Sequence, residues 1–98
     1  MPFVQIIEFQ TDRIDEFNAT VDEWLKESAS WRTATRAQLT QDRDHPGTYL
    51  NIIEFPSYEA AMENSNRPET AQFAERLAAL CKGPATFRNL NVERDETV

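Results

Sequence analysis

The sequence predicts a single α+β domain whose strands and helices follow the order β-α-β-β-α-β. Three observations favour this fold class. Four β-rich segments alternate with segments of helical periodicity, the two glycines both fall at segment boundaries, and the first and third strand segments are apolar on both faces. A length of 98 residues suits one domain. We expect that domain to span residues 1–94 and residues 95–98 to form a polar tail.

The first strand is predicted over residues 3–9 (FVQIIEF), where apolar side chains occupy both alternation sets. This pattern is typical of a central strand covered on two sides. A helix should follow, capped by the side-chain oxygen of Thr11 or Asp12. Its apolar stripe repeats at three- and four-residue steps and comprises Ile14, Phe17, Val21, Trp24 and Leu25.

Residues 31–42 are predicted to form the second strand and residues 49–55 the third. The turn between them contains Pro46 and Gly47, which commonly end regular structure. The third strand should end at Pro56, because proline has no N–H to donate to a sheet.

A second helical region is predicted in two pieces. Ser57 should cap a helix over residues 58–64, and Pro68 suits the first turn of the following piece. Gly83 and Pro84 should end that piece, and residues 86–93 should form the last strand.

Charge and composition exclude several classes of partner. The chain carries 10 Lys and Arg against 17 Asp and Glu, a formal net charge of −7, so we expect neither nucleic-acid nor membrane binding. Cys81 is the single cysteine, which rules out an intrachain disulfide and a multi-cysteine metal site. No apolar run approaches the roughly 20 residues of a membrane span. With no signal peptide recognised, a cytoplasmic location is expected.

The two-sided apolar character of the first and third strands predicts a homodimer. In a ferredoxin-like arrangement the helices cover one face of the sheet, which leaves the other face bare. Val4 and Ile6 lie in one alternation set and Phe3 and Ile7 in the other, so either exposed face would be an apolar patch. A second copy that stacks its sheet on the first would cover the patch and produce a dimeric α/β barrel.

Residues 49–62 (YLNIIEFPSYEAAM) resemble the third strand and following helix of dimeric α/β-barrel proteins, in particular the antibiotic-biosynthesis-monooxygenase-like and stress-responsive groups. The resemblance implies a cofactor-independent, monooxygenase-like protein that acts on a small aromatic or polyketide-like molecule. The alternative is a non-catalytic dimeric barrel that binds a small ligand or serves in a stress response. Whether the chain is an enzyme is left open at this point.

The resemblance also implies site residues. Pockets of the cofactor-free oxygenases contain Asn, Trp, Tyr and sometimes His, which stabilise an enolate-like anion that reacts with oxygen. On this basis Asn51 and His45 are the candidate catalytic residues, and Tyr49 and Trp31 are candidate ligand-binding residues. Asn51, Tyr49 and Trp31 could instead belong to the core or the interface, and His45 could be a solvent-facing turn residue.

Haem-degrading relatives use an Asn on the first strand and a His on a helix. Gln5 replaces that Asn here and the one histidine lies in a turn, so we expect no haem, no metal and no other cofactor.

Glu8, Glu54 and Arg36 form a second candidate set. We expect strands one and three to be neighbours and parallel, which would bring the two carboxylates together near the guanidinium of Arg36. Such a cluster can shift pKa values and hold a polar ligand. The alternative is a set of ion pairs at the barrel rim or with the partner chain.

Overall fold

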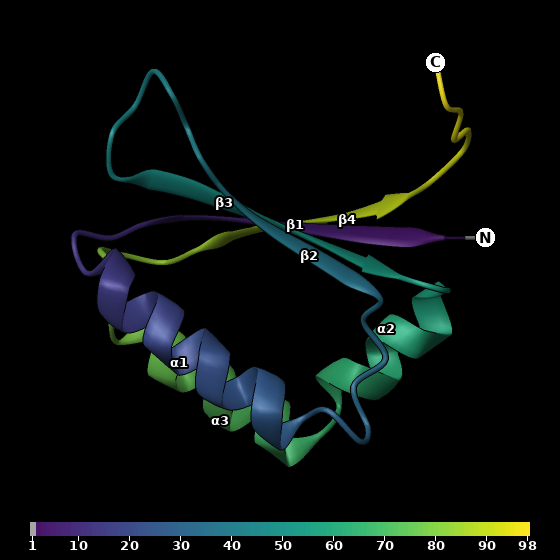
Figure 1. Ribbon diagram of the computed structural model, residues 1–98, viewed down its shortest axis with the longest axis horizontal. Coiled ribbons are helices and arrows are strands. Elements are labelled where there is room, and N and C mark those ends of the chain that lie inside the picture. Colours follow the sequence, from purple (N-terminus) through teal and green to yellow (C-terminus); the bar gives the residue numbers. More distant parts are fainter. Residues whose placement is uncertain (1) are drawn as a thin grey trace.

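The structure, a computed structural model that describes residues 2–98, is an antiparallel four-stranded sheet with helices on one of its two faces (Figure 1). The elements are β1 (Phe3–Gln10), α1 (Ile14–Glu27), β2 (Arg36–Gln41), β3 (Thr48–Phe55), α2 (Tyr58–Ser65), α3 (Pro68–Ala78) and β4 (Thr86–Asn91). The predicted α+β ferredoxin-like order is confirmed, with the second helical region divided into α2 and α3 as expected.

The strand order in the sheet is β2-β3-β1-β4, and every neighbouring pair is antiparallel. The prediction that the first and third strands are parallel is therefore wrong. After the crossover through α1, β2 runs in the same direction as β1. The hairpin between β2 and β3 then reverses the chain, so β3 runs in the opposite direction to both. Because β3 inserts between β1 and β2, it must run opposite to β1.

Local sequence explains where most elements begin and end. The Ser57 hydroxyl accepts the backbone N–H of Ala60 at 3.1 Å, which confirms it as the cap of α2. Pro68 lies in the first turn of α3, where its missing N–H has no intrahelical partner to lose. Gly47 and Gly83 have φ values of 89° and 73°, a conformation that side-chain-bearing residues rarely adopt.

Helix α1 begins differently from the prediction. Its N-cap is Arg13, without a side-chain cap, rather than Thr11 or Asp12. The buried Thr11 hydroxyl accepts the N–H of Arg13 at 3.0 Å and donates to the carbonyl of Leu80 at 2.6 Å. Thr11 therefore joins the turn before α1 to the segment that follows α3, two parts of the chain that are distant in sequence.

Strand β2 begins at Arg36, five residues later than predicted. Thr35 still donates its backbone N–H to the Glu54 carbonyl of β3 at 2.9 Å, whereas Trp31 and Thr33 contact the helices. The Trp31 ring meets the Trp24 ring edge-on, with centroids 6.2 Å apart, and the Thr33 hydroxyl donates to the carbonyl of Ala60 at 2.7 Å.

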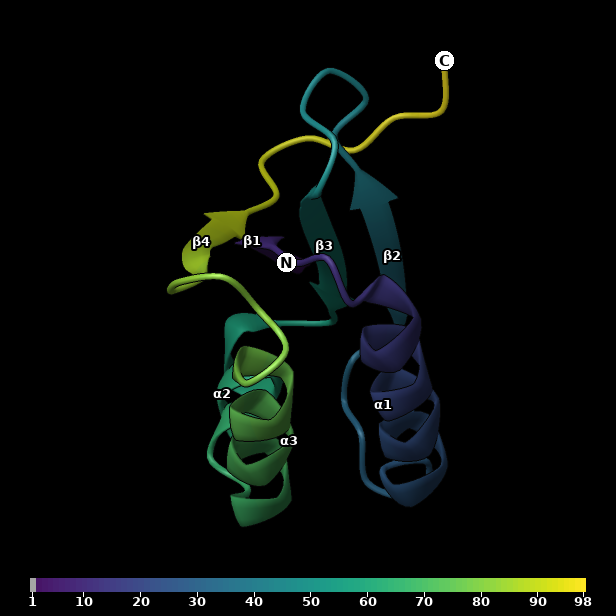
Figure 2. The same cartoon turned by 90° about the vertical axis from the view of Figure 1, so that its left-hand side faces the viewer.

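All three helices lie on the same side of the sheet, α1 beneath β2 and α2 with α3 beneath the opposite edge (Figure 2). The buried Phe3, Phe9 and Phe55 identify the alternation set that faces the helices. The opposite face, which we call the open face, carries Val4 and Ile6 together with the other even-numbered residues of β1, β2, β3 and β4. No helix within residues 2–98 is long and apolar enough to cross a bilayer.

The buried core consists of two separate groups. Phe3, Phe55 and Ala61 pack together where α2 meets the sheet. Phe9 and Phe17 stack at the opposite end of β1, with ring centroids 4.5 Å apart. The sheet residues between these two groups are not buried, and this feature positions the candidate site.

Candidate functional site

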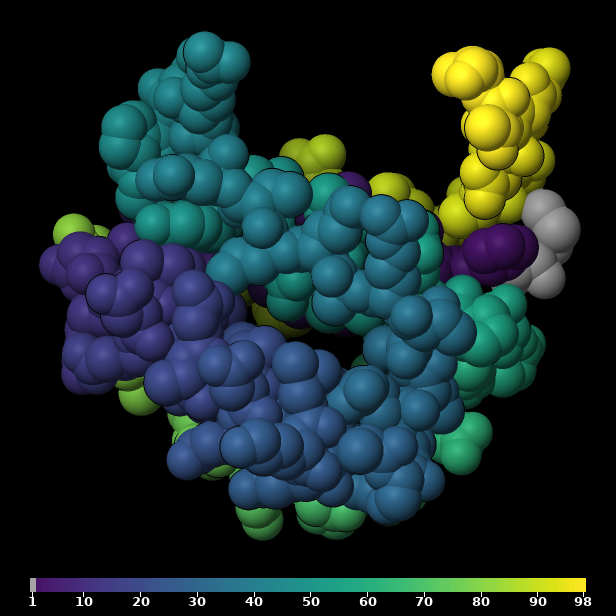
Figure 3. Space-filling model, viewed as in Figure 1, coloured from purple at the N-terminus to yellow at the C-terminus, as the bar shows by residue number. Residues whose placement is uncertain are grey.

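A hollow lies between the helices and the middle of the sheet. On β1, Gln5 and Ile7 face the helices between the buried Phe3 and Phe9, yet both are only half-buried. At the two edges of the same face, Leu39 is 38% exposed and Phe87 58% exposed. Figure 3 shows the surface hollowed between α1 and the sheet. The sheet residues that share the helix-facing alternation set between the two core groups define this helix-side hollow: Gln5, Ile7, Leu39, Asn51, Ile53, Phe87 and Asn89, of which Ile53 also packs against the Phe3–Phe55–Ala61 core.

The floor of the helix-side hollow carries amide side chains where a core would carry apolar ones. Gln5 pairs with Asn89 across β1 and β4, and its Nε2 donates to Asn89 Oδ1 at 3.1 Å. Asn51 lies opposite Ile7 across β1 and β3. Its amide makes no hydrogen bond within residues 2–98, so its donor and acceptor are free for a ligand.

The helix layer that faces this floor contains a cluster of aromatic rings. Trp24 is two turns along α1 from Phe17, so the two side chains leave the helix on the same side. The Trp24 ring stacks on Phe73 of α3 at 4.8 Å, and the Arg67 guanidinium lies 4.1 Å from the Trp31 ring centroid. The predicted ligand residue Trp31 thus belongs to the helix layer, where it contacts Trp24 and Arg67.

Four buried polar atoms lack a hydrogen-bond partner among the described residues: Trp24 Nε1, Asn64 Oδ1, Arg67 Nε and Thr70 Oγ1. All four belong to the helix layer. Native proteins pair nearly all such atoms, since an unmade bond costs about 1–3 kcal/mol. These four atoms are therefore the buried donors and acceptors that the helix layer leaves for water or a ligand.

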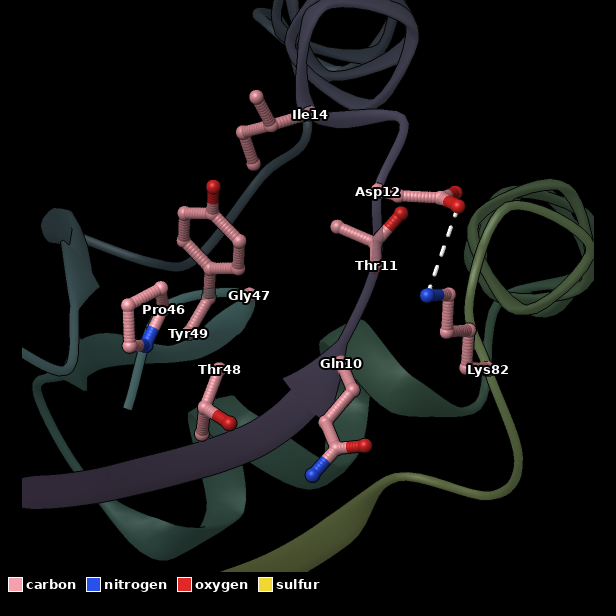
Figure 4. Close-up of a pocket in the computed structure, with 9 residues that line it drawn as sticks. All are labelled: Gln10, Thr11, Asp12, Ile14, Pro46, Gly47, Thr48, Tyr49 and Lys82. Carbon is pink, nitrogen blue, oxygen red and sulfur yellow. Dashed lines mark ion pairs between the residues drawn. The ribbon is translucent and has the colours of Figure 1, made fainter.

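A second cavity, of about 450 Å³, lies at the end of the sheet where β1 runs into α1 (Figure 4). Tyr49 lines it, with its hydroxyl directed towards Ile14. The Tyr49 ring stacks on Phe9, which in turn stacks on Phe17, so this end pocket lies beyond the aromatic stack that bounds the hollow. The full lining is Gln10, Thr11, Asp12, Ile14, Pro46, Gly47, Thr48, Tyr49 and Lys82.

The charges of the end pocket are solvent-exposed. Lys82 Nζ lies 3.4 Å from Asp12 Oδ2, and both side chains are about two-thirds exposed. Exposed pairs of this kind are screened by water and contribute little to binding or stability. The Asp12–Lys82 pair therefore adds little to ligand binding in the end pocket.

The predicted cluster of Glu8, Glu54 and Arg36 is only partly formed. All three lie on the open face, where Arg36 is directly opposite Glu54 across β2 and β3. Glu54, however, pairs with Val4, four residues from Glu8 along β1, which separates the two carboxylates by about 13 Å. The antiparallel direction of β3 is the cause, since it places the two glutamates at opposite ends of the strand pair. Glu8 instead borders a smaller cavity of about 230 Å³ with Lys82.

His45 lies in the exposed hairpin between β2 and β3, and its side chain is 74% exposed. Its Nδ1 is 3.1 Å from Asp42 Oδ2, and Asp42 also accepts the backbone N–H of Asp44. That backbone bond, with a smaller contribution from His45, holds the pKa of Asp42 below its usual value. The structure does not bring His45 together with Asn51, which faces the hollow.

Cys81 offers no nucleophile to either cavity. Burial raises the pKa of its thiol, so the side chain remains protonated at neutral pH. The thiol donates to the Leu77 carbonyl at 3.3 Å, as a structural cysteine does.

Two site residues, Gln5 and Asn89, were not among the sequence predictions. A usable signal was present for Gln5, because a polar residue stands between Phe3 and Ile7 in the alternation set that faces the core. For Asn89, strand alternation places the side chain on the opposite face from Arg88, but which of the two faces the helices depends on the register of β4.

The fold is that of antibiotic-biosynthesis-monooxygenase-like proteins of known structure. SnoaB from Streptomyces nogalater, a cofactor-independent oxygenase, superposes with a TM-score of 0.79 at 18% identity over 96% of this chain and 95% of its own. Rv0793 from Mycobacterium tuberculosis superposes with a TM-score of 0.77 at 15% sequence identity, over 99% of this chain and 100% of its own. A Caulobacter crescentus protein described as an antibiotic biosynthesis monooxygenase candidate superposes with a TM-score of 0.80 at 11% identity, over 95% of this chain and 91% of its own. No protein-family model and no curated protein matches the sequence.

Proposed function

We propose that the chain is a cofactor-independent oxygenase that acts on a flat, hydroxylated aromatic or polyketide-like molecule in the helix-side hollow. The single observation that carries this proposal is the free amide of Asn51 on the floor of the hollow, beneath a helix layer rich in aromatic rings. The likeness of fold to SnoaB, which is described as a cofactor-independent oxygenase, supports the same activity class.

The amide N–H of Asn51 would donate to the oxygen of a bound phenolate or enolate. A fixed donor in a partly water-excluded site stabilises developing negative charge more strongly than water does. The Trp24 and Phe73 rings would provide an apolar surface for the rings of the substrate. Asn51 would thus hold the substrate as the anion that reacts.

The proposed reaction requires oxygen as its only co-reactant. The aromatic anion transfers an electron to oxygen, the resulting pair forms a carbon–oxygen bond, and the ring carbon loses its proton. The hydroperoxide then breaks its O–O bond and releases water, so a phenol and one oxygen molecule give a quinone and one water. The sheet residues of the hollow carry no titratable side chain, so none of them can accept the proton of the substrate.

Oxygen uptake tests the activity. We expect the protein to increase oxygen consumption by electron-rich naphthols, and Asn51→Ala to reduce that rate about 100-fold, the size of effect seen when an oxyanion donor is removed. Asn18→Ala, an exposed asparagine on α1, is the matched control. His45→Gln tests the predicted base separately, and loss of uptake in that variant would support it. Equal uptake by wild type and Asn51→Ala would contradict the assignment.

We also propose that the open face is covered by a second copy. Val4, Ile6, Leu50 and Ile52 form an apolar centre on that face, and none of them contacts a helix layer. Arg36 and Glu54 lie beside it and make no ion pair among the described residues. Two carboxylates and two guanidinium groups, counting Glu8 and Arg88, give the face a balanced charge although the chain as a whole is acidic.

A ligand-binding protein without catalysis is the second candidate. The observation that favours it is the amide-only chemistry of the hollow floor, which can bind a hydroxylated ring but cannot itself remove a proton. Tight binding of a naphthol without any increase in oxygen uptake would identify this function.

A further inference from the structure

The helix-side hollow has a second polar point besides Asn51. Gln5 and Asn89 lie directly opposite each other across β1 and β4 and are joined by one hydrogen bond of 3.1 Å. Both side chains face the helices, because they share the alternation set of the buried Phe3. Asn89 is exposed and Gln5 half-buried, so the pair is accessible from the hollow.

The hydrogen bond between Gln5 and Asn89 determines which of their amide donors and acceptors remain available to a ligand. Gln5 Nε2 donates one proton to Asn89 Oδ1, so Gln5 keeps its Oε1 acceptor and its second N–H. Asn89 keeps both N–H groups of Nδ2. A hydroxyl or keto oxygen of a ligand can therefore be bound by two neighbouring amides at once.

The register of the sheet sets the distance between the two polar points. Asn51 lies opposite Ile7, and Gln5 is two residues from Ile7 along β1, so Gln5 and Asn51 are diagonal neighbours on one face. Diagonal neighbours in an antiparallel pair are about 7–8 Å apart. This distance is close to the length of a fused two-ring aromatic system.

We propose that the Gln5–Asn89 amide pair is a second anchoring point, which selects ligands that carry oxygens at both ends of a flat ring system. The inference rests on the proposed binding of ligands in the helix-side hollow and adds how the hollow would distinguish ligands with two oxygens from ligands with one. One oxygen binds Asn51 and reacts as its anion, while the oxygen at the far end binds Gln5 and Asn89. A ligand with a single oxygen satisfies only one of the two points.

Binding of two matched probes tests the proposal. 2,6-Dihydroxynaphthalene carries a hydroxyl at each end of its fused rings, whereas 2-naphthol carries a hydroxyl at one end only. Quenching of the fluorescence of Trp24 and Trp31 measures the binding of each probe. We expect wild type to bind the diol about tenfold more tightly, as a hydrogen-bonded anchor provides. Gln5→Leu should bring the affinity for the diol to within about twofold of that for 2-naphthol.

Two further variants complete the design. Asn89→Leu, on the exposed edge strand, should have the same effect as Gln5→Leu and replaces it if the latter does not fold. Gln72→Leu, an exposed amide on α3, should retain the tenfold preference. Equal affinity of wild type for the two probes, or equal weakening of both by Gln5→Leu and Asn89→Leu, would overturn the proposal.

Oxygen uptake separates this inference from the proposed reaction. A preference for the diol that Gln5→Leu abolishes, without oxygen uptake by wild type, would support the anchor and refute the oxygenase. Oxygen uptake with no preference between the probes would support the oxygenase and refute the anchor.

Discussion

Phe9 of β1 and Phe17 of α1 stack with their ring planes inclined by only 10° and their centroids 4.5 Å apart. Both are almost fully buried, and they hold the beginning of α1 against the sheet. We therefore expect Phe17→Ala to destabilise the fold by about 3–5 kcal/mol, as truncation of a buried aromatic does. Leu25→Ala, at a position 40% exposed on the same helix, should cost far less. Urea unfolding of the two variants makes the comparison, and equal losses would contradict this account of the α1–sheet contact.

Because of the helix-side hollow, we expect the fold to tolerate larger side chains on the helix-facing surface of the sheet. Ile7 lies in the middle of the helix-facing sheet surface but is only half-buried, so Ile7→Phe should change the free energy of unfolding by less than about 1 kcal/mol. Ala61, 2% exposed at the α2 contact, has no such room, and Ala61→Leu should cost about 1–3 kcal/mol. A larger loss for Ile7→Phe than for Ala61→Leu would mean that the hollow is filled in solution.

The alternation of apolar residues correctly divided the first strand into two faces. Phe3 and Phe9 share one face and Val4 and Ile6 the other, as their spacing indicated, but only the structure shows that the two phenylalanines are the set buried against the helices. The relation of Glu8 to Glu54 could not be obtained in this way. Alternation gives the face of a residue, whereas neighbours along a strand pair depend on strand direction and register, which tertiary connections decide.

The helix-side hollow itself was beyond sequence reasoning for a similar reason. An apolar stripe on α1 predicts that Phe17 and Trp24 face the sheet, but it does not say how closely each one approaches it. Phe17 reaches Phe9, whereas Trp24 instead stacks on Phe73 of α3. Figure 1 shows that α1 diverges from the sheet along its length. On the sheet surface that faces the helices, Gln5 and Asn51 are only half-buried and Asn89 is exposed.

The cap of α2 provides a local test. The Ser57 hydroxyl accepts one of the first-turn N–H groups of an eight-residue helix, and Ser57→Ala should reduce stability by about 1 kcal/mol. Ser30→Ala changes an exposed serine outside any helix and should remain within about 0.5 kcal/mol of wild type. If chemical denaturation gave equal midpoints for the two variants, the capping bond would have no energetic role.

The hairpin between β2 and β3 should weaken in acid. The N–H of Asp44, and to a lesser degree His45, lower the pKa of Asp42 in the folded state. A lowered folded pKa means that the stabilisation is present above the ordinary aspartate pKa and is lost as the pH falls through the lower, folded value. Carboxyl NMR shifts should therefore show Asp42 titrating below the ordinary aspartate pKa. Asp42→Asn, which keeps an oxygen to accept the Asp44 N–H, should remove the pH dependence of the hairpin amide signals.

A charge on the open face should separate the proposed dimer. Ile6 lies at the centre of that face, opposite Ile52 of β3 and flanked by Arg88 of β4. Stacking of a second sheet would remove this position from water, and burying a carboxylate there costs several kcal/mol of desolvation, which pairing with the neighbouring Arg88 repays only in part. We expect wild type to sediment as a dimer at micromolar concentration and Ile6→Glu to raise the dissociation constant by at least about 100-fold.

Leu25→Glu is the matched control, because it adds the same charge to an exposed position on α1, on the opposite layer of the molecule. Its dissociation constant should remain close to that of wild type, since no second copy is expected to cover that helix. Circular dichroism of each variant would establish that the sheet still forms. A wild-type protein that sediments as a monomer at micromolar concentration, or an Ile6→Glu variant that dimerises as wild type does, would show that a second copy does not cover the open face. The apolar centre of Val4, Ile6, Leu50 and Ile52 would then require another explanation.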